Sequence, residues 1–141
     1  MFATCFYVVA DVQRAELRFA NAGHPCALHM PCDGASAEKL DDEQSRGPVM
    51  GIFPSATYAT ATRSMVRGDR VMLFTDGLYE VEDATGALFD EEQLRATVSR
   101  HAALMPEEFF DQVVSDIRKY SQSETFADDV CVVGMQILRT E

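Results

Sequence analysis

Two groups of aspartates follow or precede apolar segments, at positions where a carboxylate can leave the core and hold an ion. Asp76 and Gly77 directly follow the apolar run RVMLFT at 70–75, and Asp128 and Asp129 lead directly into another apolar run. Two like charges at the mouth of a core strand repel each other, and a divalent cation shared with Asp76 would relieve that repulsion. These aspartates are therefore candidate ligands for magnesium or manganese, which prefer carboxylate oxygens.

Each aspartate group also has an interpretation in which no metal takes part. Asp-Gly pairs are common in ordinary turns, so Asp76 and Gly77 by themselves are more often a turn than an ion site. A solvated turn before a strand explains Asp128 and Asp129 as well as an ion does. The local pattern alone leaves both interpretations open.

A third group, NAGHP at 21–25, interrupts a strand-like segment. Gly23 tolerates backbone angles that other residues avoid, and Pro25 cannot continue a hydrogen-bonded ladder. His24 is a candidate metal ligand, general acid or hydrogen-bonded structural residue. We favour the structural role, in one motif with Asn21 and Gly23. The sequence contains no P-loop and no nucleophile elbow of the G-x-S-x-G type.

The elements that would position these residues begin with strands. Apolar, aromatic and β-branched residues predict strands at 2–10 and 15–21, which a turn at 11–14 joins into a hairpin. After the break at 22–25, residues 26–30 resume strand character. The first part of the chain is therefore expected to be β-rich.

A second hairpin is predicted from the middle of the chain. Residues 58–65 alternate, residues 70–75 form a nearly continuous apolar run, and a turn at 66–69 separates them. The later strand is expected to be buried. The polar, turn-rich residues 31–54 predict a long surface connection ahead of this hairpin.

Two amphipathic helices and a strand are expected to complete the chain. Asp90 is suited to cap a helix that begins at Glu91, and Pro106 at a first helical position opens the next one. Residues 130–138 return to strand character. This order predicts an α+β fold, with antiparallel sheets and two helices packed on one side, and 1–141 is expected to form part of one domain.

Composition excludes some classes of partner. Twelve Lys and Arg against 23 Asp and Glu give a net charge of −11, which opposes contact with nucleic acid phosphates. No apolar run approaches the roughly 20 residues needed to span a membrane. No charged and apolar leader opens the sequence, so we expect a cytoplasmic protein without a nucleic acid or membrane partner.

Five motifs resemble, in their order and spacing, those of the sporulation-protein-E-like phosphatases, a branch of the type 2C metal-dependent family. Any one of them is a weak signal, but five in order along nearly the whole chain are hard to obtain by chance. They are NAGHP at 21–25, Met50-Gly51, the segment from Arg67-Gly68-Asp69 to LFTDGLYE at 73–80, Phe89 with Glu92 to Leu94, and FADDVCVV at 126–133.

The resemblance implies a serine/threonine protein phosphatase with a two-ion manganese or magnesium centre. A water that bridges the metals would attack the phosphoprotein substrate, so no catalytic side chain beyond the metal ligands is expected. By position, Asp76 and Asp128 are implied to be metal ligands, and Asp129 a supporting or alternative ligand. Gly77 would bring backbone close to the metals. The implied substrate is a regulatory protein such as an anti-sigma-factor antagonist.

The resemblance also implies that 1–141 is the C-terminal portion of a phosphatase domain. The remaining metal ligands would then come from an N-terminal part that precedes Met1, and the isolated chain would be inactive. The alternative is a non-catalytic phosphatase-like domain that binds a partner. With a strand such as 2–10 left at a sheet edge, we expect 1–141 to form a homodimer through that edge.

Overall fold

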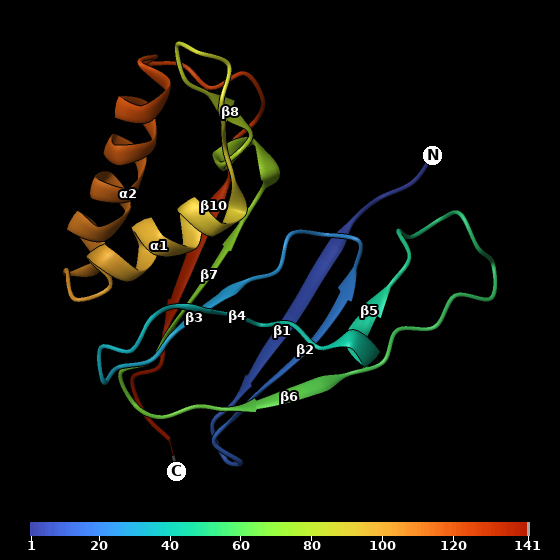
Figure 1. Cartoon of the computed structure of the whole chain (residues 1–141). Coiled ribbons are helices and arrows are strands. Elements are labelled where there is room, and N and C mark those ends of the chain that lie inside the picture. The colour runs from blue at the N-terminus through green and yellow to red at the C-terminus, as the bar shows by residue number, and fades with distance from the viewer. Residues whose placement is uncertain (141) are drawn as a thin grey trace.

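The computed structural model describes residues 1–140, which form two sheets of four strands each, a small hairpin and two helices (Figure 1). In chain order the elements are β1 (Cys5–Asp11), β2 (Glu16–Ala22), β3 (Leu28–Met30), β4 (Glu38–Lys39), the 3₁₀ turn η1 (Glu43–Ser45), β5 (Arg46–Gly47), β6 (Ala61–Ser64), β7 (Arg70–Phe74), the 3₁₀ turn η2 (Asp76–Leu78), β8 (Val81–Glu82), β9 (Leu88–Phe89), α1 (Glu91–His101), α2 (Pro106–Ser121) and β10 (Val132–Gln136).

The first sheet is built around β2. β1 pairs with β2 in antiparallel register from Cys5 opposite Ala22 to Asp11 opposite Glu16, which confirms the first predicted hairpin. On its other side, β2 pairs with β6 along its first half and with β5 at its end. β1 therefore lies at the end of this sheet, with β2 as its one strand neighbour among the described residues.

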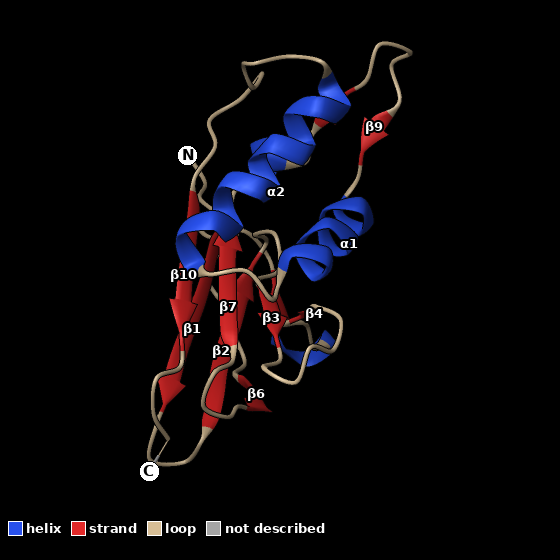
Figure 2. Ribbon diagram, turned by 90° about the vertical axis from the view of Figure 1, so that its left-hand side faces the viewer, coloured by secondary structure: helices blue, strands red, loops and turns tan. Residues whose placement is uncertain are grey.

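The second sheet has the order β10-β7-β3-β4, and all of its pairs are antiparallel. The apolar run expected to be a buried strand is β7, which lies between β3 and β10. Both helices lie over one face of this sheet (Figure 2). The predicted α+β fold, with antiparallel sheets and two helices on one side, is confirmed.

The prediction of a second hairpin is wrong. β6 pairs with β2 in the first sheet, whereas β7 pairs with β3 and β10 in the second, so the turn between them crosses from one sheet to the other. The turn is held by Asp69, which is 2% exposed. Its carboxylate accepts hydrogen bonds from the backbone N–H groups of Val66 and Cys32 and pairs with the ring of His29.

Two apolar layers hold the elements together. One lies between the second sheet and the helices, and its buried members include Leu28, Met72, Phe74, Leu78, Leu94, Val98, Phe109, Val113 and Ile117. The other belongs to the first sheet and the opposite face of the second, and it includes Phe6, Leu17, Phe19, Leu40, Met65, Val71 and Ile137. Alternate side chains of β7 thus pack into different layers, on opposite faces of the strand. This explains why its run is almost continuously apolar.

Residues 31–54 are not simply a surface connection, as the sequence led us to expect. They contain β4, η1 and β5, and Ala37, Leu40 and Ser45 are buried. Leu40 joins the layer between the sheets, and its N–H donates to the carbonyl of Ala27 at 2.8 Å. Two isolated apolar residues within a polar segment carry no periodicity, so their burial depends on the tertiary fold.

Both helices begin as their sequences predict. Asp90 and Gln93 form a reciprocal capping box at the start of α1, and Pro106 occupies the first turn of α2. The hairpin of β8 and β9 was not predicted, because each strand has only two residues. Of the helices in residues 1–140, none combines the length and apolar composition that spanning a bilayer requires.

Candidate metal centre and adjoining cleft

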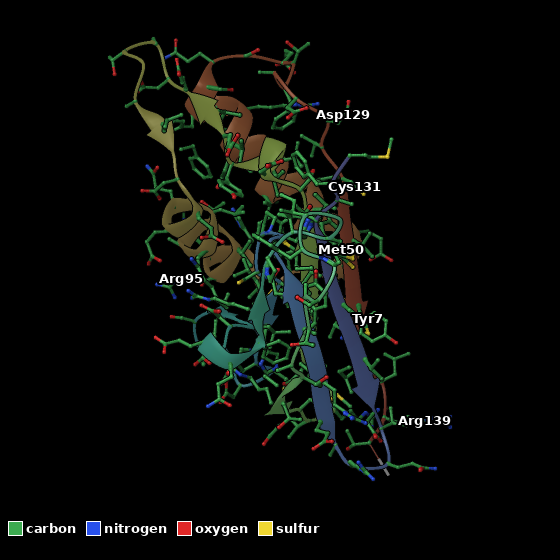
Figure 3. The ribbon with its side chains drawn as sticks, turned by 90° about the vertical axis from the view of Figure 1, so that its right-hand side faces the viewer. Tyr7, Met50, Arg95, Asp129, Cys131 and Arg139 are labelled. Atoms are coloured by element: carbon green, nitrogen blue, oxygen red, sulfur yellow. The ribbon has the colours of Figure 1, made fainter. Side chains whose placement is uncertain are left out.

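The structure brings the two aspartate segments side by side, although Gly77 and Asp128 are 51 positions apart in the sequence. The hydroxyl of Thr75 donates to the carbonyl of Asp129 at 2.9 Å and accepts from the N–H of Cys131 at 3.0 Å. The N–H of Thr75 also donates to the carbonyl of Cys131. Asp129 and Cys131 lie in the upper part of the molecule as Figure 3 shows it. Pairing of β7 with β10 therefore places the end of one strand against the entry to the other.

Gly77 is required here for space. A Cβ atom at this position would lie 2.7 Å from the carbonyl oxygen of Asp129 and 3.3 Å from the carbonyl carbon of Asp128. Backbone atoms cannot swing away as a flexible side chain can, so any larger residue would push the two segments apart. The sequence suggested a sharp turn at Gly77, and the structure adds the close approach as a second reason for glycine.

The three carboxylates themselves are exposed and do not converge. Asp76 accepts from the N–H of Gly77 at 3.0 Å, and Asp128 accepts from the N–H of Asp129 at 2.7 Å. Within residues 1–140, no group of three or more His, Cys, Asp or Glu side chains is placed to hold a metal ion. Their oxygen atoms suit magnesium or manganese, but the described residues do not assemble a complete site.

Asp76 also lines a polar cleft together with the NAGHP segment at 21–25, which lies in a different part of the sequence. The cleft lies between the ends of the two sheets and the start of α1. Its lining residues are Asn21, Gly23, His24, Pro25, Cys26, Lys39, Asp41, Arg46, Gly47, Asp76, Tyr79 and Glu91. The fold thus joins two of the motifs that the sequence analysis singled out.

The NAGHP segment is a tightly held loop. The side-chain amide of Asn21, which is buried, donates to the carbonyl of His24 and accepts from its N–H, both at 2.8 Å. Gly23 has a φ of 69°, and a Cβ there would lie 2.5 Å from Cγ1 of Val49. The Nδ1 atom of His24 lies 2.9 Å from the hydroxyl of Thr4. These contacts agree with the structural role that we favoured for this motif.

Four charged side chains of the cleft form two ion pairs. Lys39 binds Glu91, and Arg46 binds Asp41. The hydrogen bond and charge of Arg46 hold the pKa of Asp41 below its usual value. Sequence analysis did not single out these four residues, because two-residue strands and a polar connection show no local pattern that distinguishes them from an ordinary solvated surface.

Tyr79 is the aromatic side chain of the cleft. Burial, followed by the carboxylates of Glu91 and Asp76, raises its pKa to about 12. Its phenol therefore stays protonated at neutral pH and can donate a hydrogen bond. The sequence contains Tyr79 within LFTDGLYE, but nothing in that motif separates a cleft residue from a core residue.

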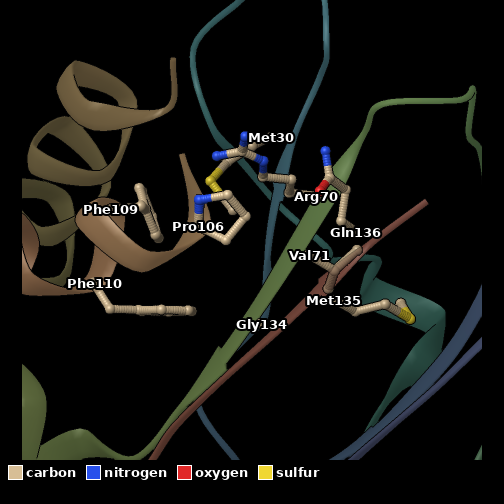
Figure 4. A pocket seen from close by; sticks show the side chains of 9 residues that line it. All are labelled: Met30, Arg70, Val71, Pro106, Phe109, Phe110, Gly134, Met135 and Gln136. Atoms are coloured by element: carbon tan, nitrogen blue, oxygen red, sulfur yellow. The ribbon is translucent and has the colours of Figure 1, made fainter. Parts of the chain in front are cut away.

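A second cavity lies away from these residues and is mainly apolar. It is enclosed by the first turn of α2 and by β7 and β10 (Figure 4). Its floor is close-packed, since a Cβ on Gly134 would lie 2.5 Å from the ring of Phe110. At its rim, the guanidinium of Arg70 donates to the carbonyls of Ala102 and Leu104 at 3.3 and 2.6 Å, which ties β7 to the end of α1. The residues around this cavity therefore hold the helices against the second sheet.

Comparison with known proteins places the chain in a family. Residues 1–138 match the family described as stage II sporulation protein E. "Phosphoserine phosphatase RsbU" of Bacillus subtilis (strain 168) is 23% identical over 133 residues, covering 94% of this chain and 38% of that protein. The chain spans only 20 to 38% of the length of the curated relatives it matches.

Solved structures show the same fold. The SiaA-PP2C domain of Pseudomonas aeruginosa has a TM-score of 0.77 at 20% identity, with 94% of this chain and 51% of that chain covered. The phosphatase domain of SpoIIE from Bacillus subtilis, presoaked with Mn, has a TM-score of 0.71 at 16% identity, with 98% and 58% covered. Two of the relatives it matches are named phosphoserine phosphatase. The match to the family over 138 of 141 residues shows that this chain belongs to the stage II sporulation protein E family.

Proposed function

We propose that this chain is part of an enzyme that removes phosphate from phosphoserine or phosphothreonine on a regulatory protein. The observation that carries the proposal is the contact between Gly77 and the backbone of Asp128 and Asp129, which brings two acidic motifs together. One of them, Asp76, also lines a polar cleft. Relatives named phosphoserine phosphatase support the same reaction class. An anti-sigma-factor antagonist is the kind of regulatory protein that we propose as substrate.

We propose magnesium or manganese as the cofactor, in a centre of two ions. Asp76 and Asp128 would hold the metals, and Asp129 would support them or act as an alternative ligand. Such ions activate water and neutralise phosphoryl charge, which suits direct hydrolysis of a phosphoester. Because the described residues provide no group of three ligands, the complete centre requires further ligands from outside 1–141.

The isolated chain is therefore proposed to be inactive. The test compares purified 1–141 with a longer protein that contains it together with the upstream part of the phosphatase domain. We expect hydrolysis of a phosphoserine peptide by the longer protein, dependent on Mn²⁺ and abolished by a chelator, and none by 1–141. Failure of the longer protein to hydrolyse the peptide with either metal would contradict the enzymatic proposal.

A second candidate is a non-catalytic phosphatase-like domain that binds a partner. It is favoured by the exposed carboxylates, which do not converge on a common point in residues 1–140. Isothermal titration calorimetry of the longer protein with Mn²⁺ separates the two candidates. Two bound ions per protein support the enzyme, whereas no metal binding together with retained binding of a phosphoprotein supports the partner-binding domain.

We also propose that 1–141 forms a homodimer through β1. This strand has β2 as its one strand neighbour among the described residues, and its outward side chains Tyr7 and Val9 are 64% and 39% exposed. Tyr7 also lines an apolar groove together with Met50 and Tyr58. An unpaired edge next to apolar surface favours pairing with a second copy.

The cytoplasmic location stays a prediction.

A further inference from the structure

We propose that His24 binds the phosphate group of the substrate, through its Nε2 atom, inside the cleft that it shares with Asp76. This inference deepens the proposed function and rests on it, because it assigns a substrate contact within the same site.

The loop holds the backbone of His24 in one position. The side-chain amide of Asn21 donates a hydrogen bond to the carbonyl of His24 and accepts one from its backbone N–H. Gly23 adopts a φ of 69° and has no room for a Cβ beside Val49. A preorganised group binds a ligand without a further loss of conformational freedom, so such a loop is suited to recognition.

The ring of His24 is oriented by one nitrogen and available through the other. The hydroxyl of Thr4 lies 2.9 Å from Nδ1, and a hydroxyl that donates to Nδ1 leaves the ring proton on Nε2. Within residues 1–140, Nε2 makes no hydrogen bond and is not among the buried atoms without a partner. His24 lines the cleft, so in the tautomer that accepts from Thr4 its ring offers the N–H of Nε2 to a ligand there.

The lysine and the arginine of the cleft are each paired with a carboxylate. Lys39 is paired with Glu91, and Arg46 is paired with Asp41. A phosphate that enters this cleft therefore meets donors from His24 and from the phenol of Tyr79, beside the carboxylate of Asp76 that we propose as a metal ligand. A charge-assisted hydrogen bond from Nε2 to a phosphate oxygen is stronger than a neutral one.

Two substitutions separate a role of Nε2 from a role of Nδ1. Glutamine carries its amide nitrogen near the position of Nε2, whereas asparagine carries it near the position of Nδ1. A hydrogen bond to a charged group contributes about 1.5 kcal/mol or more, so its loss should weaken binding about tenfold. We therefore expect His24→Asn to weaken phosphate binding about tenfold and His24→Gln to stay within about threefold of the unmodified chain.

The affinity of 1–141 and of both variants for N-acetyl-O-phosphoserine amide is measured in the presence of Mg²⁺ by ³¹P NMR of the ligand. In the unmodified chain, NMR of the ¹⁵N-labelled histidine side chains shows which ring nitrogen takes part. N-acetylserine amide is the control ligand and should leave the Nε2 signal unchanged, and inorganic phosphate tests whether the phosphate group alone is sufficient for recognition. We expect the phosphoester and the free ion to shift the Nε2 signal of His24, with the signals of His29 and His101 unchanged. His101→Gln, at the end of α1 where His101 pairs with Asp116, is the control variant.

The proposal is overturned if neither phosphate compound shifts the Nε2 signal, or if asparagine preserves binding better than glutamine. The second result would assign His24 to a structural role through Thr4. The experiment measures binding and not turnover, so a longer protein without phosphatase activity would defeat the proposed function and leave this result standing.

Discussion

At the scale of single residues, Asp69 is the carboxylate that the fold buries among residues 1–140. It is 2% exposed, and it accepts from two backbone N–H groups and from Nε2 of His29 at 2.9 Å. Burial by itself would raise the pKa of Asp69, but the bonds from Val66, Cys32 and His29 together lower it. Asp69 therefore ties the turn after β6 to β3 and to the segment that follows β3.

Replacing Asp69 by asparagine should destabilise the fold. At neutral pH, we expect Asp69→Asn to lower the free energy of unfolding by about 2 to 3 kcal/mol, because an amide nitrogen cannot accept the bonds that a carboxylate oxygen accepts. Urea denaturation followed by circular dichroism measures the change. The control is Asp111→Asn on the exposed side of α2, which should change the free energy of unfolding by less than about 0.5 kcal/mol.

The contribution of Asp69 to the free energy of unfolding should decrease as the pH is lowered. Because its pKa is lowered in the folded state, its contribution is fully present above the unfolded pKa of about 3.9 and is lost as the pH falls toward the folded pKa. The difference in stability between the unmodified chain and Asp69→Asn should therefore be constant from pH 7 to about pH 5 and shrink below about pH 4. A difference that grows on acidification would contradict this assignment.

The proposed metal ligands make a separate prediction at this scale. In a longer protein that is active, Asp76→Asn and Asp128→Asn should each reduce turnover of a phosphoserine peptide at least about 100-fold, since even loss of a residue that only supports a ligand costs 10-fold to 100-fold. Both side chains are exposed, so the stability of the fold should hardly change. Steady-state rates with Asp111→Asn as control measure the effect, and an unchanged rate removes the residue from the site.

At the scale of elements, the start of α1 connects helix stability to the cleft. The side chain of Asp90 accepts from the N–H of Gln93 at 2.8 Å, and the side chain of Gln93 accepts from the N–H of Asp90 at 2.9 Å. The next residue, Glu91, lines the cleft and binds Lys39. The cap therefore holds the first turn of α1 in the position where the carboxylate of Glu91 reaches Lys39 in β4.

Removing this cap should weaken the helix and loosen the cleft. We expect Asp90→Ala to lower the free energy of unfolding by about 1 kcal/mol, the usual contribution of an N-cap side chain. Faster hydrogen exchange at the amides of the first turn of α1, measured by NMR, should accompany this loss. Asp111→Ala within α2 serves as the control. Unchanged exchange in Asp90→Ala would show that packing of Leu94 and Val98 holds the turn without the cap.

At the scale of the whole molecule, the open edge at β1 predicts self-association. Sedimentation equilibrium at micromolar concentration should show 1–141 as a dimer whose population rises with salt, because a net charge of −11 on each copy opposes pairing and salt screens it. Val9→Lys places a charge on the exposed face of β1 and should give a monomer. Lys119→Arg on α2 is the control. A folded monomer at every salt concentration would contradict the dimer.

The sequence by itself determined the features that depend on neighbouring residues. The hairpin of β1 and β2, the burial of β7 and the starts of both helices follow from periodicity, turn residues and caps, all of which act over a few positions. The candidate aspartates were also visible, because Asp76 and Asp128 stand directly at the ends of apolar runs. Their motifs sufficed to indicate the family.

Only the tertiary structure decided the features that depend on contacts between distant residues. Local alternation cannot say which strand a neighbour in sequence will pair with, so the turn after β6 was mistaken for a hairpin when it crosses between sheets. His29 and Asp69 are 40 residues apart, and Gly77 meets Asp129 across a larger gap. The cleft residues Lys39 and Arg46 lie in a polar segment without periodicity, and they reach the site because burial of Leu40 draws that segment against the sheets.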